Sequence, residues 1–381
     1  MKATLTKAQA RGAWIGAQRL DKVEPFGAGP AATRSTIEHL GYVQIDTINV
    51  IERSHHHILF NRIPKYQRAD LRAAQSVEKS VFEYWTHALS YVPSRDLRFF
   101  MPAMKRMQRE PGQWLSAVKP EELRKVLRLI KAEGPISIRD IDDDVLVEKS
   151  HPWASRKPSK KALQFGFFSG RLVVSERIGM LKKYELLERH FDWAEREKPK
   201  PATEKEITAY LLDRSLRAQS FVSLDSICHL QPKKKPLLEK LIASRVQRGE
   251  LIEIQVPGVE KFKFWQSPKE FEAAREIEGD QTHLLSPFDP LVIQRKRLHA
   301  FFDYDHRFEA YLPKEKRKFG YFTLPVVVGD KVVAAIDLKT DRDARRLLVQ
   351  KWTWINGAKA AKFKSRIEAE LHRFEAFQLG F

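Results

Sequence analysis

Apolar positions near the N-terminus recur with the period of an α-helix, which Thr6 can cap. Its apolar face consists of Ala10, Ala13, Trp14 and Ala17. The stretch FGAGP, rich in glycine and proline, separates it from a second helix predicted over residues 31–40 and ended by Gly41. The apolar run YVQIDTI then predicts a strand, and further helices are expected from Ser54 and over residues 70–79.

The middle of the chain repeats one order of elements. Helices are predicted over residues 121–131, near Ser137 and over 160–169 in the first copy, and over 204–217, after Ser223 and over 236–248 in the second. In each copy a glycine, Gly170 or Gly249, ends the last helix and a hairpin-like stretch follows. Three helices and a two-stranded wing are the plan of a winged helix. Because the N-terminal run also ends in helix, glycine and strand, three such units are expected.

Two more hairpins and a terminal helix complete the predicted elements. VFEYWTHALSYVP alternates like a β-ribbon, and apolar runs flank the turn dipeptide Gly329-Asp330. Residues 358–381 have the apolar spacing of an amphipathic helix. The predicted fold is therefore mostly α with small β elements (α+β), built from tandem winged-helix units and a C-terminal β-rich unit. The expected segments are 1–118, 119–198, 199–283 and 284–381, with a charged linker at 195–206.

Charge narrows the class of partner. The 381-residue chain has 68 Lys and Arg against 49 Asp and Glu, a formal net charge of +19. Such a surplus attracts polyanions, nucleic acid first and anionic membranes second, although it also serves simply to keep a protein in solution. Cys228 is the single cysteine, which excludes a disulfide framework and a cysteine zinc site. Without a secretory signal or a membrane-length apolar run, a cytoplasmic protein is expected.

Two polar residues in the predicted strand are the first candidates for chemistry. Side chains alternate along a strand, so Gln44 and Asp46 would share a face, with Cβ atoms roughly 6–7 Å apart. This spacing can hold one water or one sugar carbon. In the alternative interpretation Asp46 caps the next helix or pairs with Arg53, and Gln44 binds a backbone group.

Several separated stretches carry a resemblance to a known family. They are LGYVQIDTINVIERSHHHILFNR, EYWTHALSYVP, LLSPFDPLVIQRKR and YDHRFEAYLPKEKRKFGYFTLPVVVGDKVVAAIDLKTDR. Together with the two wing repeats, they closely resemble the YcaQ/AlkZ-like winged-helix DNA glycosylases over nearly the whole chain. The resemblance implies a concave basic cleft and an active site of the form Gln-apolar-Gln or Gln-apolar-Asp. Gln44-Ile45-Asp46 matches the second form.

The activity implied by this resemblance is release of guanine alkylated at N7, including the unhooking of interstrand crosslinks, as a step of base excision repair. Such a guanine is cationic and leaves without prior protonation. Asp46 is expected to stabilise the sugar cation and to orient or deprotonate water, which Gln44 would also hold. No lysine stands out as a Schiff-base nucleophile, so a monofunctional enzyme without cofactor or metal is expected. It would act as a monomer on the bacterial nucleoid. Whether the base is flipped stays open, because a crosslinked guanine cannot swing freely.

Basic and aromatic residues are the candidates for binding double-stranded DNA. Winged helices place a recognition helix in the major groove and a wing on the backbone. The candidates for DNA contact are His55, His87, Lys160, Lys161, Lys233, Lys234, Arg295, Arg297, Lys316, Arg317 and Tyr321. Any of the lysines could instead belong to a solvated face, and His87 could be a core histidine.

Three consecutive histidines, His55 to His57, do not predict a metal site. Neighbouring side chains on a helix point about 100° apart and cannot converge on one ion. The competing function is a non-enzymatic DNA-binding regulator, in which Gln44 and Asp46 would be structural. It would prefer one DNA sequence and release no base. A nuclease is disfavoured because no carboxylate cluster for paired metals lies near the basic segments.

Overall fold

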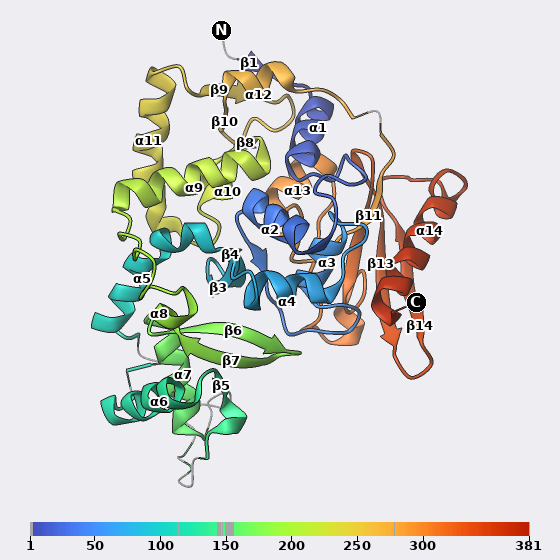
Figure 1. Ribbon diagram of the computed structural model, residues 1–381. Coiled ribbons are helices and arrows are strands. Elements are labelled where there is room, and N and C mark those ends of the chain that lie inside the picture. The colour runs from blue at the N-terminus through green and yellow to red at the C-terminus, as the bar shows by residue number, and fades with distance from the viewer. Residues whose placement is uncertain are drawn as a thin grey trace. The chain divides into compact units, whose positions relative to one another are not determined.

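The computed structural model describes residues 3–112, 115–116, 118–142, 146, 148, 156–277 and 279–380. The chain divides into two compact units. The first unit comprises Met1–Gln67, His87–Leu89 and Thr208–Phe381, and the second comprises Arg68–Thr86 and Ser90–Ile207. In Figure 1 the second unit is coloured from light blue to green. It is thus an insertion in the sequence of the first, while the predicted four-part division stays a prediction.

The helices largely follow the predicted pattern. Those of the first unit are α1 (Lys7–Ala17), α2 (Gly29–Leu40), α3 (Ser54–Phe60), α10 (Leu224–Ile227), α11 (Lys235–Gln247), α12 (Pro268–Ala273), α13 (Arg295–Phe302) and α14 (Ala360–Leu379). Those of the second are α4 (Arg68–Ser76), α5 (Leu97–Arg109), α6 (Pro120–Glu133), α7 (Pro158–Phe168) and α8 (Leu187–His190). The chain passes from the second unit to the first within α9 (Glu204–Gln219).

Several helices begin and end at the capping residues predicted from the sequence. Thr6 caps α1: its hydroxyl accepts from the Gln9 amide at 3.0 Å, and the Gln9 side chain accepts from the Thr6 amide at 2.9 Å. Gly41 ends α2 with a φ of 79°, and its missing Cβ leaves room for the side chain of Arg214. A larger residue at 41 would meet both backbone strain and this side chain. Gly170 and Gly249 have φ values of 68° and 71° after α7 and α11, as the repeat predicted.

The strands form several small sheets. Along the chain they are β1 (Ala3–Thr4), β2 (Val43–Gln44), β3 (Val81–Trp85), β4 (Leu89–Pro93), β5 (Ile136–Ser137), β6 (Leu172–Ile178), β7 (Leu181–Leu186), β8 (Phe221–Val222), β9 (Ile252–Gln255), β10 (Phe264–Gln266), β11 (Thr282–Leu284), β12 (Thr323–Val328), β13 (Lys331–Asp341) and β14 (Arg346–Trp354). In the second unit the order β5-β7-β6 includes the first predicted wing. Naming these helix and strand sets winged helices remains a prediction.

The first unit contains two four-stranded sheets. One has the order β1-β9-β10-β8, in which β1 runs parallel to β9 and pairs Ala3 with Ile254. The other has the order β11-β12-β13-β14, all antiparallel, and α14 packs against β11 and β14 beside it (Figure 1). The hairpin at Gly329-Asp330 joins β12 to β13 as predicted. Ile367, Leu371 and Phe374 form the buried face of α14.

A buried ion pair holds the centre of the first unit. The carboxylate of Asp289 accepts from both terminal nitrogens of Arg62, at 2.8 and 3.1 Å, and both side chains are 0% exposed. Arg62 also donates to the Gln18 carbonyl at 2.9 Å, to the Gln18 side chain at 3.0 Å and to the Ile58 carbonyl at 3.2 Å. The guanidinium therefore joins the end of α1, α3 and the turn that contains Asp289.

The predicted strand over YVQIDTI is wrong beyond its first half. Regular strand structure covers only Val43–Gln44, although the Ile45 amide still donates to the Leu89 carbonyl at 2.8 Å. Asp46 then turns the chain, because its Oδ1 accepts from the amide of Ile48 at 2.8 Å. This is the local side chain to backbone bond with which aspartate starts turns. Alternating strand faces therefore do not relate Gln44 to Asp46.

Among the described residues, no helix combines the length and the apolar character needed to cross a membrane.

Buried neutral histidines predict that the fold loses stability in acid. Nε2 of His57 donates to the Leu284 carbonyl at 2.7 Å, and Nε2 of His283 donates to the Leu20 carbonyl at 2.8 Å. Burial lowers the pKa of each histidine to about 4. Between this value and the unfolded pKa of about 6.5 the unfolded chain binds more protons, so stability rises with pH and is lost on acidification. Each histidine should cost about 2 kcal/mol at about pH 5 relative to neutral pH.

The measurement is urea unfolding followed over this pH range. A falling midpoint with an unchanged slope would support the assignment, and a midpoint constant between about pH 7 and pH 5 would contradict it. His57→Gln keeps a side chain that can bind a carbonyl but removes one titrating group, so its pH dependence should be shallower.

Candidate active site

Gln44 is the last residue of β2, and a hydrogen bond to its backbone fixes its position. Its carbonyl accepts from the hydroxyl of Ser54, the first residue of α3, at 2.9 Å. The residue is 6% exposed. Helix α3 and the strand end are therefore joined directly at the residue predicted to be catalytic.

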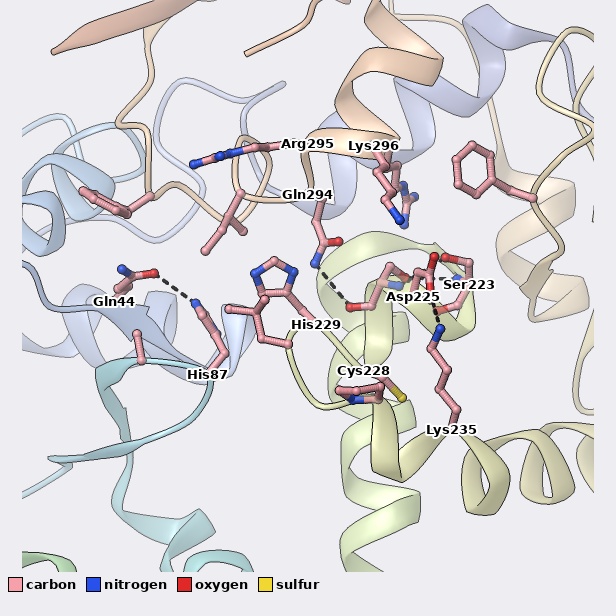
Figure 2. A pocket seen from close by; sticks show the side chains of 18 of the residues that line it. Gln44, His87, Ser223, Asp225, Cys228, His229, Lys235, Gln294, Arg295 and Lys296 are labelled. Atoms are coloured by element: carbon pink, nitrogen blue, oxygen red, sulfur yellow. Dashed lines mark hydrogen bonds and ion pairs between the residues drawn. The ribbon is translucent and has the colours of Figure 1, made fainter. Parts of the chain in front are cut away.

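The side chain of Gln44 bonds to His87. The Oε1 of Gln44 lies 3.0 Å from Nε2 of His87, which leaves the amide nitrogen turned away from the imidazole (Figure 2). The ring of His87 packs edge-on against Tyr42 and His229, at 5.1 and 5.0 Å between centres. His87, predicted to contact DNA, is thus placed against the predicted catalytic amide.

Burial determines the charge of this histidine. Removal from water, followed by the neighbouring His229 and Arg214, lowers the pKa of His87 to about 3. Burial also lowers the pKa of His229. A neutral imidazole carries one proton, and placing it on Nε2 makes His87 the donor and Gln44 the acceptor. The surroundings of the Gln44 amide therefore carry no imidazolium charge at neutral pH.

Asp46 is half-buried and lies on the loop after β2. Burial raises the pKa of its carboxyl, and the amides of Ile48 and Thr47 partly oppose this rise. A carboxylate with a raised pKa is a better proton acceptor than one in free solution. Asp46 does not line the cavity described below.

The loop that carries Asp46 is held by β13 and the turn that follows it. The amide of Thr340 donates to the Val50 carbonyl at 2.9 Å. Arg342 donates to the carbonyls of Asn49 and Ile51, at 3.0 and 2.8 Å. These bonds satisfy loop carbonyls that no regular element pairs, so the C-terminal sheet helps to fix the position of Asp46.

A cavity of about 570 Å³ opens beside Gln44 and His87. Figure 2 shows these two side chains near His229 and Gln294, with Arg295 and Lys296 at the start of α13. The remaining lining residues include three aromatic side chains, Phe262, Phe264 and Phe288. Lys235 also lines the cavity and pairs with Asp225. The cavity thus joins neutral imidazoles, apolar rings and cationic side chains, a combination suited to a base attached to a phosphate backbone.

The residues predicted to contact DNA differ in solvent exposure and in the unit to which they belong. Lys233, Arg295, Lys316 and Tyr321 are exposed, Lys234 and Arg317 are partly exposed, and all belong to the first unit. Lys160 and Lys161 lie on α7 in the second unit, the former exposed and the latter partly so. These positions are compatible with phosphate contact, which stays a prediction for each of them.

Two predicted contacts have positions that differ from the expected ones. Arg297 is 4% exposed: its guanidinium donates to the Gln219 side chain and the Phe221 carbonyl, each at 2.8 Å. The ring centres of Trp14 and Phe221 lie 4.1 and 4.0 Å from it. His55 is 3% exposed, with its ring 4.3 Å from that of His56. Arg297 ends the basic run RKR and His55 begins the run of three histidines. Each lies on a helix, and its position on that helix points its side chain into the protein.

Sequence reasoning missed His229 and Gln294. Gln294 donates to the Ser226 carbonyl at 3.2 Å and thereby ties the start of α13 to α10. His229 lies just before the basic run PKKK, and no spacing in the sequence marked it as a candidate. Within the described ranges, no group of three or more His, Cys, Asp or Glu side chains could hold a metal ion.

Comparison with known proteins identifies the family of this site. The family model for DNA glycosylase AlkZ-like proteins matches residues 37–377, a region that includes Gln44, Asp46, His87 and the whole cavity. The structure is similar to that of the Streptomyces sahachiroi DNA glycosylase AlkZ, with a TM-score of 0.63 and 16% sequence identity. This likeness covers 99% of the present chain and 98% of the other, and it shows a shared fold.

The hydrogen bond to Gln44 predicts how His87 titrates. Its ring should stay neutral, with the proton on Nε2, down to about pH 4, because burial lowers its pKa to about 3. Nitrogen chemical shifts of labelled imidazoles report both the charge and the tautomer, and His87→Gln assigns the signal. A His87 signal that titrates near the ordinary value of about 6.5 would contradict the proposed donor role.

Proposed function

This chain belongs to the DNA glycosylase AlkZ-like family, and from that premise we propose that it hydrolyses the N-glycosidic bond of guanine alkylated at N7. The proposal includes guanine in interstrand crosslinks. The non-enzymatic regulator considered from the sequence is set aside, because the family is one of DNA glycosylases. The observation that carries the proposal is the pair of environments at the two candidate residues: the amide of Gln44 is oriented by a hydrogen bond from His87, and the carboxylate of Asp46 is half-buried.

The proposed reaction begins with a leaving group that is already cationic. The bond between C1′ of the deoxyribose and N9 breaks, and its electrons neutralise the positive charge of the departing guanine. The sugar becomes oxocarbenium-like, and the carboxylate of Asp46 stabilises this positive charge. Water then adds to C1′ and its proton passes to Asp46. A second carboxylic acid that protonates the leaving group, as in common glycoside hydrolysis, is not needed.

The charge distribution around the amide favours such a substrate. Neutral His87 bonds to Gln44, and His229, whose pKa is also lowered by burial, packs against His87. Arg295 and Lys296 line the same cavity. A cationic base would meet no imidazolium charge beside Gln44, while cationic side chains attract the anionic backbone. The amide nitrogen of Gln44, turned away from His87, is then free to orient the attacking water. We further propose that the protein acts as a monomer, without lyase chemistry, cofactor or metal.

Removal of either catalytic side chain should abolish excision while DNA binding persists. Asp46→Asn and Gln44→Ala should each slow single-turnover release of 7-methylguanine from duplex DNA by about 100-fold or more, because they act on the sugar cation and its water. The measurement is strand cleavage at the resulting abasic sites, together with dissociation constants for the same duplex. Asp142→Asn, a change at an exposed carboxylate of the second unit, should leave both unchanged.

Undiminished turnover by Asp46→Asn would rule out its proposed role. A duplex joined through N7 of two guanines by a nitrogen mustard tests unhooking on a denaturing gel. Excision of other damaged bases but not of these guanines would leave the protein a DNA glycosylase and overturn the proposed specificity.

His87 should act through Gln44 as a positioning residue. His87→Phe keeps the ring packing against Tyr42 and His229 but removes the donor, and about tenfold slower excision is expected from loss of one hydrogen bond. In a Gln44→Ala background the same change should have little further effect, since the amide that His87 orients is gone. Equal losses in both backgrounds would show that His87 acts independently. His87→Gln, which restores an N–H donor, should recover part of the rate.

A further inference from the structure

Residues 309–320 form a loop that is closed at its base by one buried carboxylate. Glu309 is 2% exposed and accepts from three backbone amides, those of Lys318, Phe319 and Gly320, at 2.8, 2.7 and 3.2 Å. A second bond crosses the loop, where Nε of Arg317 donates to the Leu312 carbonyl at 2.8 Å. The conformation of the loop is therefore set before any partner arrives, and ordering it adds little entropic cost to binding.

The closed loop carries an aromatic side chain into solvent. Tyr311 is 84% exposed, the largest fraction among the exposed large apolar side chains that the structure describes, and Leu312 beside it is 41% exposed. Within the part of the chain that the structure describes, its ring contacts that of Phe308, 5.8 Å between centres, and most of its surface is available. Burial in the core does not explain a tyrosine in this position.

The same loop is strongly basic. It has four cationic residues, Lys314, Lys316, Arg317 and Lys318, against the exposed Glu315. The guanidinium of Arg317 lies 4.9 Å from the ring centre of Tyr321, in a cation–π contact. An exposed aromatic ring among cationic side chains is the combination with which proteins stack on bases while holding phosphates.

A chain of aromatic rings connects this loop to the cavity wall. Phe308 contacts Tyr311 on one side and Phe288 on the other, with 5.2 Å between the centres of Phe308 and Phe288. Phe288 lines the cavity that also contains Gln44. Phe308, which directly precedes the loop, therefore contacts a residue of the cavity wall. A duplex bound at the cavity would extend toward the side chains of the loop.

We propose that the loop of residues 309–320 is a duplex-contacting element, in which Tyr311 stacks on base pairs next to the damaged nucleotide and the cationic side chains hold the adjacent phosphates. The partner is double-stranded DNA. The inference rests on the DNA glycosylase activity of the family and not on N7 specificity. Stacking at this place would stabilise a duplex that has been opened beside the lesion.

The test uses a duplex with a stable tetrahydrofuran abasic-site analogue and 2-aminopurine as the neighbouring base. Binding of the unaltered protein should change the 2-aminopurine fluorescence, because the signal of this base depends on its stacking. Tyr311→Ala should weaken binding about tenfold and abolish the fluorescence change, whereas Tyr311→Phe and Tyr311→Trp should keep both. Since the side chain is 84% exposed, the thermal unfolding of Tyr311→Ala should match that of the unaltered protein.

Salt dependence separates stacking from phosphate contact. Tyr311→Ala should leave the slope of log affinity against log salt unchanged, while Lys316→Gln should reduce it by about one. Val77→Ala, a change of a 78% exposed apolar side chain in the second unit, is the matched control and should alter neither. Binding and fluorescence of Tyr311→Ala equal to those of the unaltered protein would overturn the proposal. Because the probe contains no alkylated guanine, failure of the proposed N7 specificity would leave this outcome unaffected.

Discussion

The ion pair between Arg62 and Asp289 is the interaction on which the candidate site depends. Two charges that are wholly removed from water are tolerated only where most of their hydrogen-bonding groups are used, and Arg62 binds Gln18 and the Ile58 carbonyl in addition to Asp289. Leaving either charge alone would cost several kcal/mol. The pair therefore requires α1, α3 and the segment around Asp289 to keep one arrangement.

The constraint that the Arg62–Asp289 ion pair sets extends to the candidate site through α3. Arg62 holds this helix near its C-terminal end, and Ser54 at the other end binds the carbonyl of Gln44. The amide of Gln44 is then oriented by His87, a neutral residue in a strongly basic protein. Support from packed elements and a hydrogen bond from a neutral imidazole are thus combined at Gln44, the predicted catalytic amide.

Local patterns predicted most of the elements because their causes are local. The Thr6 cap, the glycine stops and the hairpin at Gly329-Asp330 each depend on a few neighbouring residues. The predicted strand over Asp46 was wrong because its own side chain bonds to the backbone of Ile48 and turns the chain. The partner of Gln44 lies 43 residues away, and Arg297 is committed to the core through residues more than 70 positions distant. Such contacts have no signal in a single sequence. The alternating pattern of the predicted strand singled out Gln44 and Asp46 as candidates, but it left a structural alternative open. The resemblance to a family is what favoured a catalytic role, and that role stays a prediction.

The interrupted order of the first unit has a consequence for biosynthesis. Its core combines Leu5 and Trp14 with Phe301 and Val332, and its β1 pairs with a strand about 250 residues downstream. The ribosome therefore completes the inserted second unit long before it makes the last segments that pack against the N-terminal helix. His87–Leu89, which belong to the first unit, are made within that insertion. During that interval the apolar face of α1 has no native cover, so a nascent chain of this protein offers chaperones a binding site that the mature one conceals.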